Sequence, residues 1–437
     1  MDRLAHFFSL ALLVIFSADV LALESIVVAS SFPKEVLVAY KKAFDERNPQ
    51  YRLEFVNFPG TNIIPFLTDR TPGSRPDVFW SSSPDSFRAL LRHGLLQTIG
   101  SQGNPSIPSK IGSLNIDDPD GFYKGQALSG YGIMWNTRYL SARTISPPGT
   151  WSDLVKPELF GHVVMSSPSR SGTTHLIVES ILQGAGWENG WSLIIQIAGN
   201  CATITDRSFD VPNSITSGRF GVGLVVDFLA LSGKYSGFPV DFTYAWPSAI
   251  TPASIGLVTG ARNSEGGLKF ITFALSKEGQ SLLLRSEISR LPVLPEIYAS
   301  TDRPADYPDL FDVIKKHPST YNPDISEARH LVVNAIFNQV VTFRHRELVD
   351  VTKAIQSAER LLIKRPHAEA GVLIDKARAL IYRPPVSEKD ELTTSPQLQT
   401  RAHIAAIAAR EAEWARQTSK NYVSAKKLVE QALAMMQ

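Results

Sequence analysis

The hydrophobic positions in the first part of the chain alternate between strand spacing and helix spacing. Residues 26–28 form a short apolar run, residues 29–31 form a polar turn, and Val36, Tyr40 and Phe44 recur every four residues, as on one face of a helix. The order of strand, serine-rich turn and helix returns over residues 78–92. This alternation predicts an α/β lobe with a largely parallel sheet.

A second set of the same elements follows. Residues 121–140 are predicted to be extended, residues 163–185 to form strand, turn and helix, and residues 220–231 to form a buried strand that ends in a turn. Residues 240–258 are again predicted to be extended, which would return the chain to the first lobe. We therefore predict an α/β fold with two lobes, one formed by residues 23–125 and 250–324 and the other by residues 126–249.

The pattern changes near residue 325. Glycine almost disappears, and residues 331–365 and 400–435 are predicted to form long amphipathic helices separated by a polar linker over residues 382–399. We expect residues 325–437 to be a helical extension that packs on the lobes; a separate functional domain is the alternative.

The N-terminus has the layout of a secretory signal. Arg3 precedes an apolar run from Phe7 to Phe16, and small residues end the segment at Ala22. We predict that residues 1–22 are a cleaved signal peptide and that the mature protein lies outside the cytoplasm. An uncleaved anchor and a buried first helix are the alternatives. Cys201, the single cysteine, is expected to be a small buried hydrophobic residue.

The overall charge and the absence of known motifs restrict the classes of function to be considered. A net charge of +2 over 437 residues, without a dense run of Lys or Arg, gives no support to nucleic-acid binding. The chain has no P-loop, no G-x-S-x-G, no H-E-x-x-H and no paired-cysteine motif. We therefore expect neither catalysis nor a cofactor nor a metal centre.

The turn at residues 169–175, with the sequence SRSGTTH, has the residues of an anion site. A helix N-terminus offers unpaired N–H groups, and here it is combined with a glycine, an arginine and the hydroxyls of Ser171, Thr173 and Thr174. The alternative is that Ser and Thr only cap the helix. The candidate contacts in this turn are Arg170, Ser171, Gly172, Thr173, Thr174 and His175.

Two other polar turns follow predicted strands, and ligands of open α/β sheets gather at the carboxyl ends of strands. A carboxylate that follows the apolar strand at residues 222–226 would be costly unless it is paired or faces a cleft, so Asp227 could accept ligand hydroxyls; the alternative is a helix cap. The serine runs could also be caps. The predicted contacts outside the SRSGTTH turn are Ser30, Ser31, Trp80, Ser81, Ser82, Tyr131 and Asp227, with Trp80 and Tyr131 as apolar walls.

Four stretches of the chain, at residues 75–87, 127–140, 150–187 and 209–232, resemble the extracellular solute-binding protein family 1 of bacterial ABC transporters. The resemblance implies a periplasmic-binding-protein type II fold whose two hinged lobes close on a ligand without a reaction. It lies near the hexose-phosphate and iron(III) branches. Iron binders use an adjacent tyrosine pair where this chain has Asp227 and Phe228, which argues against iron(III), whereas an aspartate at this point would bind ligand hydroxyls in the hexose-phosphate branch.

These observations predict a periplasmic protein that captures a small anionic metabolite, such as a sugar phosphate, a phosphoglycerate-like compound or a carboxylate, and presents it to an ABC permease. One alternative is a ligand sensor that docks on a membrane histidine kinase through the helices after residue 325. A second alternative is an iron(III)-binding transport protein, and a third is an enzyme of unknown type.

Overall fold

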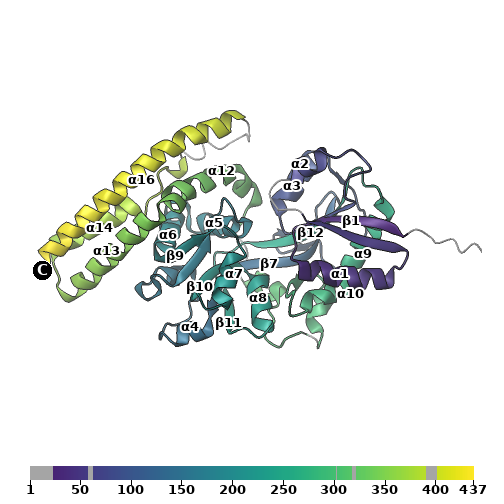
Figure 1. Cartoon of the computed structure of the whole chain (residues 1–437), viewed down its shortest axis with the longest axis horizontal. Helices are drawn as coiled ribbons and strands as arrows, with labels where there is room; N and C mark the ends of the chain where they lie inside the picture. The colour runs from purple at the N-terminus through teal and green to yellow at the C-terminus, as the bar shows by residue number, and fades with distance from the viewer. Residues whose placement is uncertain (1–22, 58–62, 302, 317–320, 390–400) are drawn as a thin grey trace, which may run out of the picture.

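The computed structural model describes residues 23–57, 63–301, 303–316, 321–389 and 401–437 (Figure 1). The predicted signal peptide, residues 1–22, lies outside these residues. Within them, no helix is both long enough and apolar enough to cross a membrane.

Lobe 1 is built from the alternating elements that the hydrophobic pattern predicts. Strand β1 pairs in parallel with β2 on one side and β3 on the other. Helix α1 buries Val36, Tyr40 and Phe44 against this sheet, as their four-residue spacing predicts. The elements of this part are β1 (Glu24–Ser30), α1 (Lys34–Arg47), β2 (Tyr51–Asn57), α2 (Ile63–Thr68), β3 (Val78–Ser81), α3 (Pro84–Arg92), β4 (Leu96–Gln97), β5 (Lys110–Ile111) and β6 (Leu114–Asn115).

Two long strands connect the lobes. Residues 123–130 of β7 (Tyr123–Asn136) pair with β12 (Ile250–Val258), and residues 131–135 pair with β10 (Val222–Val226). With β8 (Val163–Ser166) and β9 (Cys201–Thr205) the sheet is continuous, in the order β2-β1-β3-β12-β7-β10-β8-β9. Gly132 allows β11 (Val240–Tyr244) to pair closely with β7, because a Cβ atom there would lie 2.0 Å from the carbonyl oxygen of Thr243.

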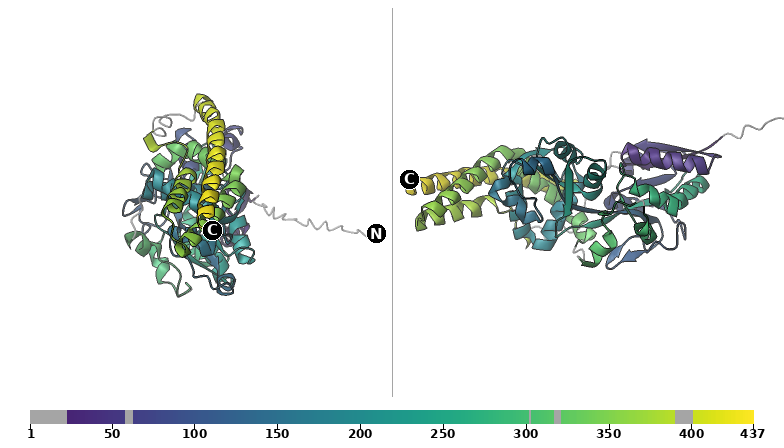
Figure 2. Two further views of the ribbon diagram at one scale, coloured as in Figure 1. Left: turned by 90° about the vertical axis from the view of Figure 1, so that its left-hand side faces the viewer. Right: turned by 90° about the horizontal axis from the view of Figure 1, so that it is seen from below.

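Lobe 2 lies on the other half of β7 and repeats the α/β order (Figures 1 and 2). Its β8 pairs in parallel with both β9 and β10, and α5 and α6 contribute apolar side chains to the core beside these strands. Its elements are α4 (Thr137–Ser141), β8 (Val163–Ser166), α5 (Gly172–Ala185), α6 (Trp187–Asn200), β9 (Cys201–Thr205), α7 (Asp210–Thr216), β10 (Val222–Val226), α8 (Asp227–Tyr235) and β11 (Val240–Tyr244).

After β12 the chain adds α9 (Ser264–Ala274), α10 (Lys277–Ser281), β13 (Leu291–Pro292) and α11 (Leu310–Lys316). β13 pairs with β7 at Leu128 and Ala127, which places the residues before it next to the strands that join the lobes. Residue boundaries for the two lobes stay a prediction, since β7 and β12 belong to one continuous sheet.

The C-terminal extension consists of α12 (Pro323–Val340), α13 (His345–Lys364), α14 (Ala368–Ile381) and α16 (Arg401–Met435). Val333 and Phe337 of α12 share one hydrophobic core with Trp187 and Trp191 of α6. The extension therefore packs on lobe 2, as expected from the sequence, and α13, α14 and α16 project from it away from lobe 1 (Figures 1 and 2).

Candidate functional site

Asp227 is a fully buried carboxylate at the first position of α8, where β10 ends. Its Oδ2 accepts hydrogen bonds from the Gly130 N–H at 2.7 Å and the Tyr244 hydroxyl at 3.1 Å, and its Oδ1 accepts one from the Phe228 N–H at 2.7 Å. Burial raises its pKa from an ordinary value of 3.8 to about 7, although these three donors act in the opposite direction. The group is thus poised between neutral and charged forms near neutral pH.

Arg290 lies between aromatic rings from the two lobes. Its guanidinium carbon is 4.1 Å from the ring centre of Phe32, which follows β1, and 3.8 Å from that of Phe228 on α8. The aromatic rings cover the two faces of the guanidinium group. Its N–H groups point outward in the plane of the group and can still donate to oxygen acceptors. Nη1 donates to Ser82 Oγ at 2.9 Å, while Nε has no hydrogen-bond partner among the described residues.

Burial lowers the pKa of Arg290 to about 10, so the side chain stays charged at neutral pH although it is only 1% exposed. The charge of Asp227 opposes this lowering of the pKa more than any other group does. Among the described residues, however, no ion pair within 4.0 Å joins Arg290 to Asp227. A buried cation without a bonded carboxylate, and with one unused donor, is the arrangement that an anionic ligand completes.

The backbone before Arg290 is held in an uncommon conformation. Ser289 has φ of 47°, in the left-handed region that few residues other than glycine adopt. Its hydroxyl donates to the carbonyl oxygen of Ser286 at 2.9 Å, and the residue is fully buried. Non-glycine residues held in this region concentrate at functional sites, which agrees with a placement of Arg290 that depends on Ser289.

The predicted serines of lobe 1 lie together, but most of them satisfy local groups. Ser30 Oγ accepts from the Phe32 N–H, Ser81 Oγ accepts from the Ser83 N–H, and the hydroxyls of Ser31 and Ser81 lie 3.0 Å apart. Ser82 is the one among them whose hydroxyl contacts Arg290.

The two predicted aromatic walls take different positions. Trp80 is buried in the core of lobe 1, where its indole N–H donates to Gln126 and its ring packs edge-on against Phe32. Trp80 therefore supports Phe32, which in turn stacks on Arg290. The Tyr131 hydroxyl lies 3.0 Å from that of Thr251, and the charges that act on it are those of Asp227, Arg290 and Asp85.

The SRSGTTH turn begins α5. Ser171 is the N-cap and accepts from the Thr174 N–H at 3.1 Å, while Arg170 is exposed and pairs with Asp206. Gly172 is exposed and Thr173 is half-buried, whereas the Thr174 hydroxyl faces that of Ser166 inside the lobe. The capping alternative is therefore present in the structure, and a ligand contact from Gly172 or Thr173 stays a prediction.

His175 faces the C-terminal extension. Its Nδ1 lies 3.1 Å from Asn334 Oδ1, and its Nε2 lies 3.3 Å from Ser326 Oγ and 3.1 Å from His330 Nδ1, all on α12. Only 1% of the side chain is exposed, and burial lowers its pKa to about 3, with the charges of His330 and Arg329 acting in the same direction. The structure thus places His175 in a helix–helix contact.

The sequence reasoning missed Arg290, Phe32, Phe228 and Tyr244 as candidate site residues. One signal for Arg290 was available, because this charged residue directly precedes the apolar run Leu291–Leu294. A charged residue that is buried next to such a run is expected to have either a partner or a function. The three aromatic residues carry no comparable signal, because an isolated Phe or Tyr in an α/β protein is an ordinary core residue.

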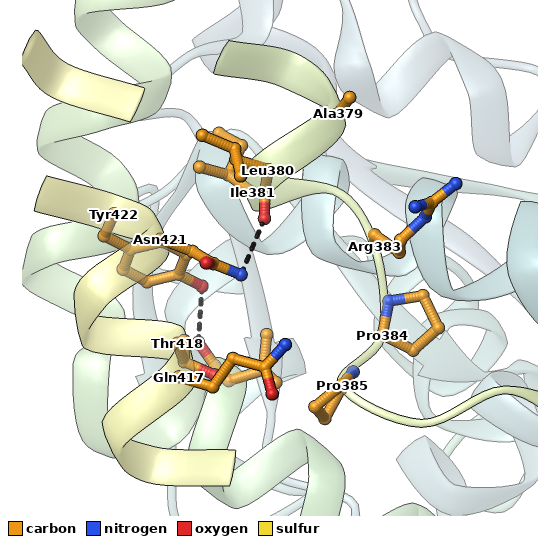
Figure 3. A pocket seen from close by; sticks show the side chains of 11 residues that line it. Ala379, Leu380, Ile381, Arg383, Pro384, Pro385, Gln417, Thr418, Asn421 and Tyr422 are labelled. Atoms are coloured by element: carbon orange, nitrogen blue, oxygen red, sulfur yellow. Dashed lines mark hydrogen bonds between the residues drawn. The ribbon is translucent and has the colours of Figure 1, made fainter. Parts of the chain in front are cut away.

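Two cavities in the described part of the chain lie away from Arg290. One, of about 180 Å³, lies between the end of α14 and the middle of α16, where Asn421 donates to the Leu380 carbonyl and Tyr422 donates to that of Val340 (Figure 3). The other, of about 150 Å³, lies near Arg70, Arg75 and Arg262 at one end of lobe 1. Both are smaller than ordinary small-molecule pockets.

Two α/β lobes that share two connecting strands, with charged and aromatic groups from both lobes meeting between them, define a binding protein of the two-lobed periplasmic type. The chain belongs to the family of bacterial extracellular solute-binding proteins, whose model matches residues 74–315. This assignment confirms the family resemblance read from the sequence.

Individual relatives agree with this assignment. The chain is 33% identical over 311 residues, 70% of this chain and 74% of the relative, to the phosphoglycerate transport regulatory protein PgtC of Salmonella typhimurium. Its fold is similar to that of the periplasmic binding protein AfuA of Actinobacillus pleuropneumoniae with fructose 6-phosphate bound, at a TM-score of 0.55 and 18% identity, over 65% of this chain and 92% of that one.

A ferric binding protein from Campylobacter jejuni has the same fold at a TM-score of 0.51 and 16% identity, over 61% of this chain and 86% of that one. At these identities the two structures show the shared fold, which confirms the predicted fold class. The family and the fold are those of binding proteins.

Proposed function

We propose that this protein captures a small anionic metabolite in the periplasm by closure of its two lobes and delivers it to an ABC permease. The family supports a periplasmic solute-binding role. The observation that carries the ligand class is Arg290, a buried cation with an unused Nε–H group between aromatic rings of both lobes. A phosphate or carboxylate would accept from this group in its plane.

In this proposal Arg290 and Ser82 bind the anionic group, and Asp227 binds ligand hydroxyls. The Asp227 carboxylate lies near enough to Arg290 to act on its charge without forming an ion pair with it, so one ligand could contact both. Phe32 and Phe228 come from different lobes, so closure assembles the stack around Arg290. The predicted contacts at Gly172 and Thr173 would supply backbone donors from the start of α5.

The relatives support a phosphorylated ligand over a simple carboxylate. PgtC is named for phosphoglycerate transport regulation, and AfuA is solved with fructose 6-phosphate. The chain has Asp227 and Phe228 where the iron(III) branch is expected to have two tyrosines, so ferric ion serves as the contrasting ligand in the test.

A thermal-shift screen of the mature protein tests the proposal. The panel contains sugar phosphates, phosphoglycerates, inorganic phosphate, dicarboxylates and ferric ion. A ligand at one hundred times its dissociation constant adds about 2.7 kcal/mol to the free energy of unfolding, which gives a clear rise in Tm. We expect a phosphorylated compound to raise Tm in the wild type and to lose this effect in Arg290→Gln. A response to ferric ion alone would overturn the proposal.

A further inference from the structure

Helix α12 is anchored to lobe 2 through a buried ion pair. Arg329 donates from Nε to both carboxylate oxygens of Glu179 on α5 at 3.0 Å, and from Nη2 to one of them at 2.9 Å. The two side chains are 5% and 0% exposed, and the Arg329 guanidinium also lies 5.2 Å from the Trp187 ring centre. Separation of such a pair would leave two uncompensated buried charges, so α12 moves with lobe 2.

The same helix reaches lobe 1 through more exposed ion pairs. Arg88 of α3 donates to Glu327 of α12 at 3.0 Å and also pairs with Asp324, and Arg92 of α3 pairs with Glu327. Arg92 and Asp324 are 51% and 76% exposed, whereas Arg88 and Glu327 are 26% and 15% exposed. The pairs that include Asp324 or Arg92 are open to water and contribute little each. None of the three pairs is buried as deeply as that of Arg329 with Glu179, so this end of α12 separates from lobe 1 more readily than the other end separates from lobe 2.

The position of this contact ties it to the interlobe site. α3 begins directly after the turn that contains Ser82, and α12 runs along lobe 2 toward α3 (Figure 1). The charged and titratable groups on the facing elements are Asp85, Arg88 and Arg92 of α3, Asp324, Glu327 and His330 of α12, and His175 and Glu179 of α5. The strands β7 and β12 join the two lobes through the sheet. Helix α12 also contacts both lobes, and it does so through charged side chains.

We propose that α12 is an electrostatic bridge that holds the lobes in the closed arrangement, with its lobe 2 end permanent and its lobe 1 end releasable. We call the pairs of Arg88 and Arg92 with Asp324 and Glu327 the α12 bridge. Its strength sets the fraction of the protein that is closed before ligand binds, and the apparent affinity follows that fraction. Because α12 continues into α13, α14 and α16, opening of the lobes also moves the helical extension relative to lobe 1.

The inference rests on the proposed function only in that the lobes open and close. It is tested without ligand, by the distance between spin labels measured by double electron–electron resonance in the mature chain. The labels are placed by Glu46→Cys on α1 and Asn189→Cys on α6, two exposed positions, while native Cys201 is buried. The test variant is Asp324→Asn with Glu327→Gln, and Arg88→Gln breaks the same contact from the other side.

Glu278→Gln is the matched control, because it removes an ion pair with Arg47 that lies entirely within lobe 1. We expect both bridge variants to shift the distance distribution toward longer, broader values and the control to leave it unchanged. In the wild type, 1 M KCl should reproduce the shift by screening the charges. For any panel compound that binds, the bridge variants should weaken affinity by about 3- to 10-fold.

Distance distributions that superimpose for the wild type, both bridge variants and the control would overturn the inference, whatever the ligand screen shows. A shift in the control as large as that in the bridge variants would overturn it as well, since the effect would then not depend on α12. A failed ligand screen with a clear distance shift would count against the proposed function alone.

Discussion

Arg290 Nη1 donates a hydrogen bond to Ser82 Oγ at 2.9 Å, which joins the residue before β13 to the turn after β3. This contact positions a charged side chain between the lobes without an ion pair to hold it there.

Asp227→Asn should make stability less dependent on pH. Burial raises the pKa of Asp227 to about 7, from 3.8 in the unfolded chain, so the folded protein binds this proton more tightly. The free energy of unfolding of the wild type therefore falls as pH rises from about 4 to about 7 through this group. Urea unfolding at pH 5 and pH 8 measures it: the variant should gain stability relative to the wild type at pH 8, and an equal difference at both values would contradict the assignment.

His175→Gln should make the stability of the folded protein less sensitive to acid. Burial lowers the pKa of His175 to about 3, so below its ordinary value of 6.5 the unfolded chain takes up a proton that the folded protein does not. The wild type therefore loses stability through this group as pH falls from 6.5 toward 3. Thermal unfolding between pH 7.5 and pH 4.5 should show a smaller fall in Tm for the variant, and parallel curves would count against a neutral, buried His175.

Glu179→Gln should destabilise the protein strongly, because it leaves the Arg329 guanidinium buried opposite a neutral side chain. We expect a loss of about 3–5 kcal/mol in the free energy of unfolding. Glu359→Gln is the control: it removes an ion pair with Arg378 that is 34% and 38% exposed, and it should cost less than about 1 kcal/mol. Chemical denaturation compares the two, and a loss for Glu179→Gln as small as that of the control would show that α12 is not anchored at this point.

Much of the fold could be predicted from the sequence because it depends on local periodicity. A four-residue repeat, as in Val36, Tyr40 and Phe44, places apolar side chains on one face of a helix, and the alternation in residues 51–55 places them on one face of a strand. The structure contains both the helix and the strand. Such signals need no knowledge of distant partners.

The candidate site was less predictable because its groups meet through tertiary contacts. Ser82 and Arg290 are 208 residues apart, and no local pattern links them. Hydroxyl-rich turns look alike in sequence whether they cap a helix or bind a ligand, so Ser171 and Ser83, both N-caps here, could not be told apart from Ser82. The neighbours of His175 in the sequence indicate an anion site. Its actual partners on α12 lie more than 150 residues away, so the local sequence does not reveal them.

The most direct test of the central claim is isothermal titration calorimetry of the tightest phosphorylated ligand from the screen with the wild type, Arg290→Gln and Arg285→Gln. Arg285 is an exposed arginine of the same segment that pairs with Glu287, so its variant matches the loss of charge. We expect Arg290→Gln to weaken binding by about 10- to 100-fold, because it removes a charge-assisted hydrogen bond, and Arg285→Gln to leave the affinity unchanged. Equal affinity in all three proteins would contradict the claim that Arg290 binds the anionic group.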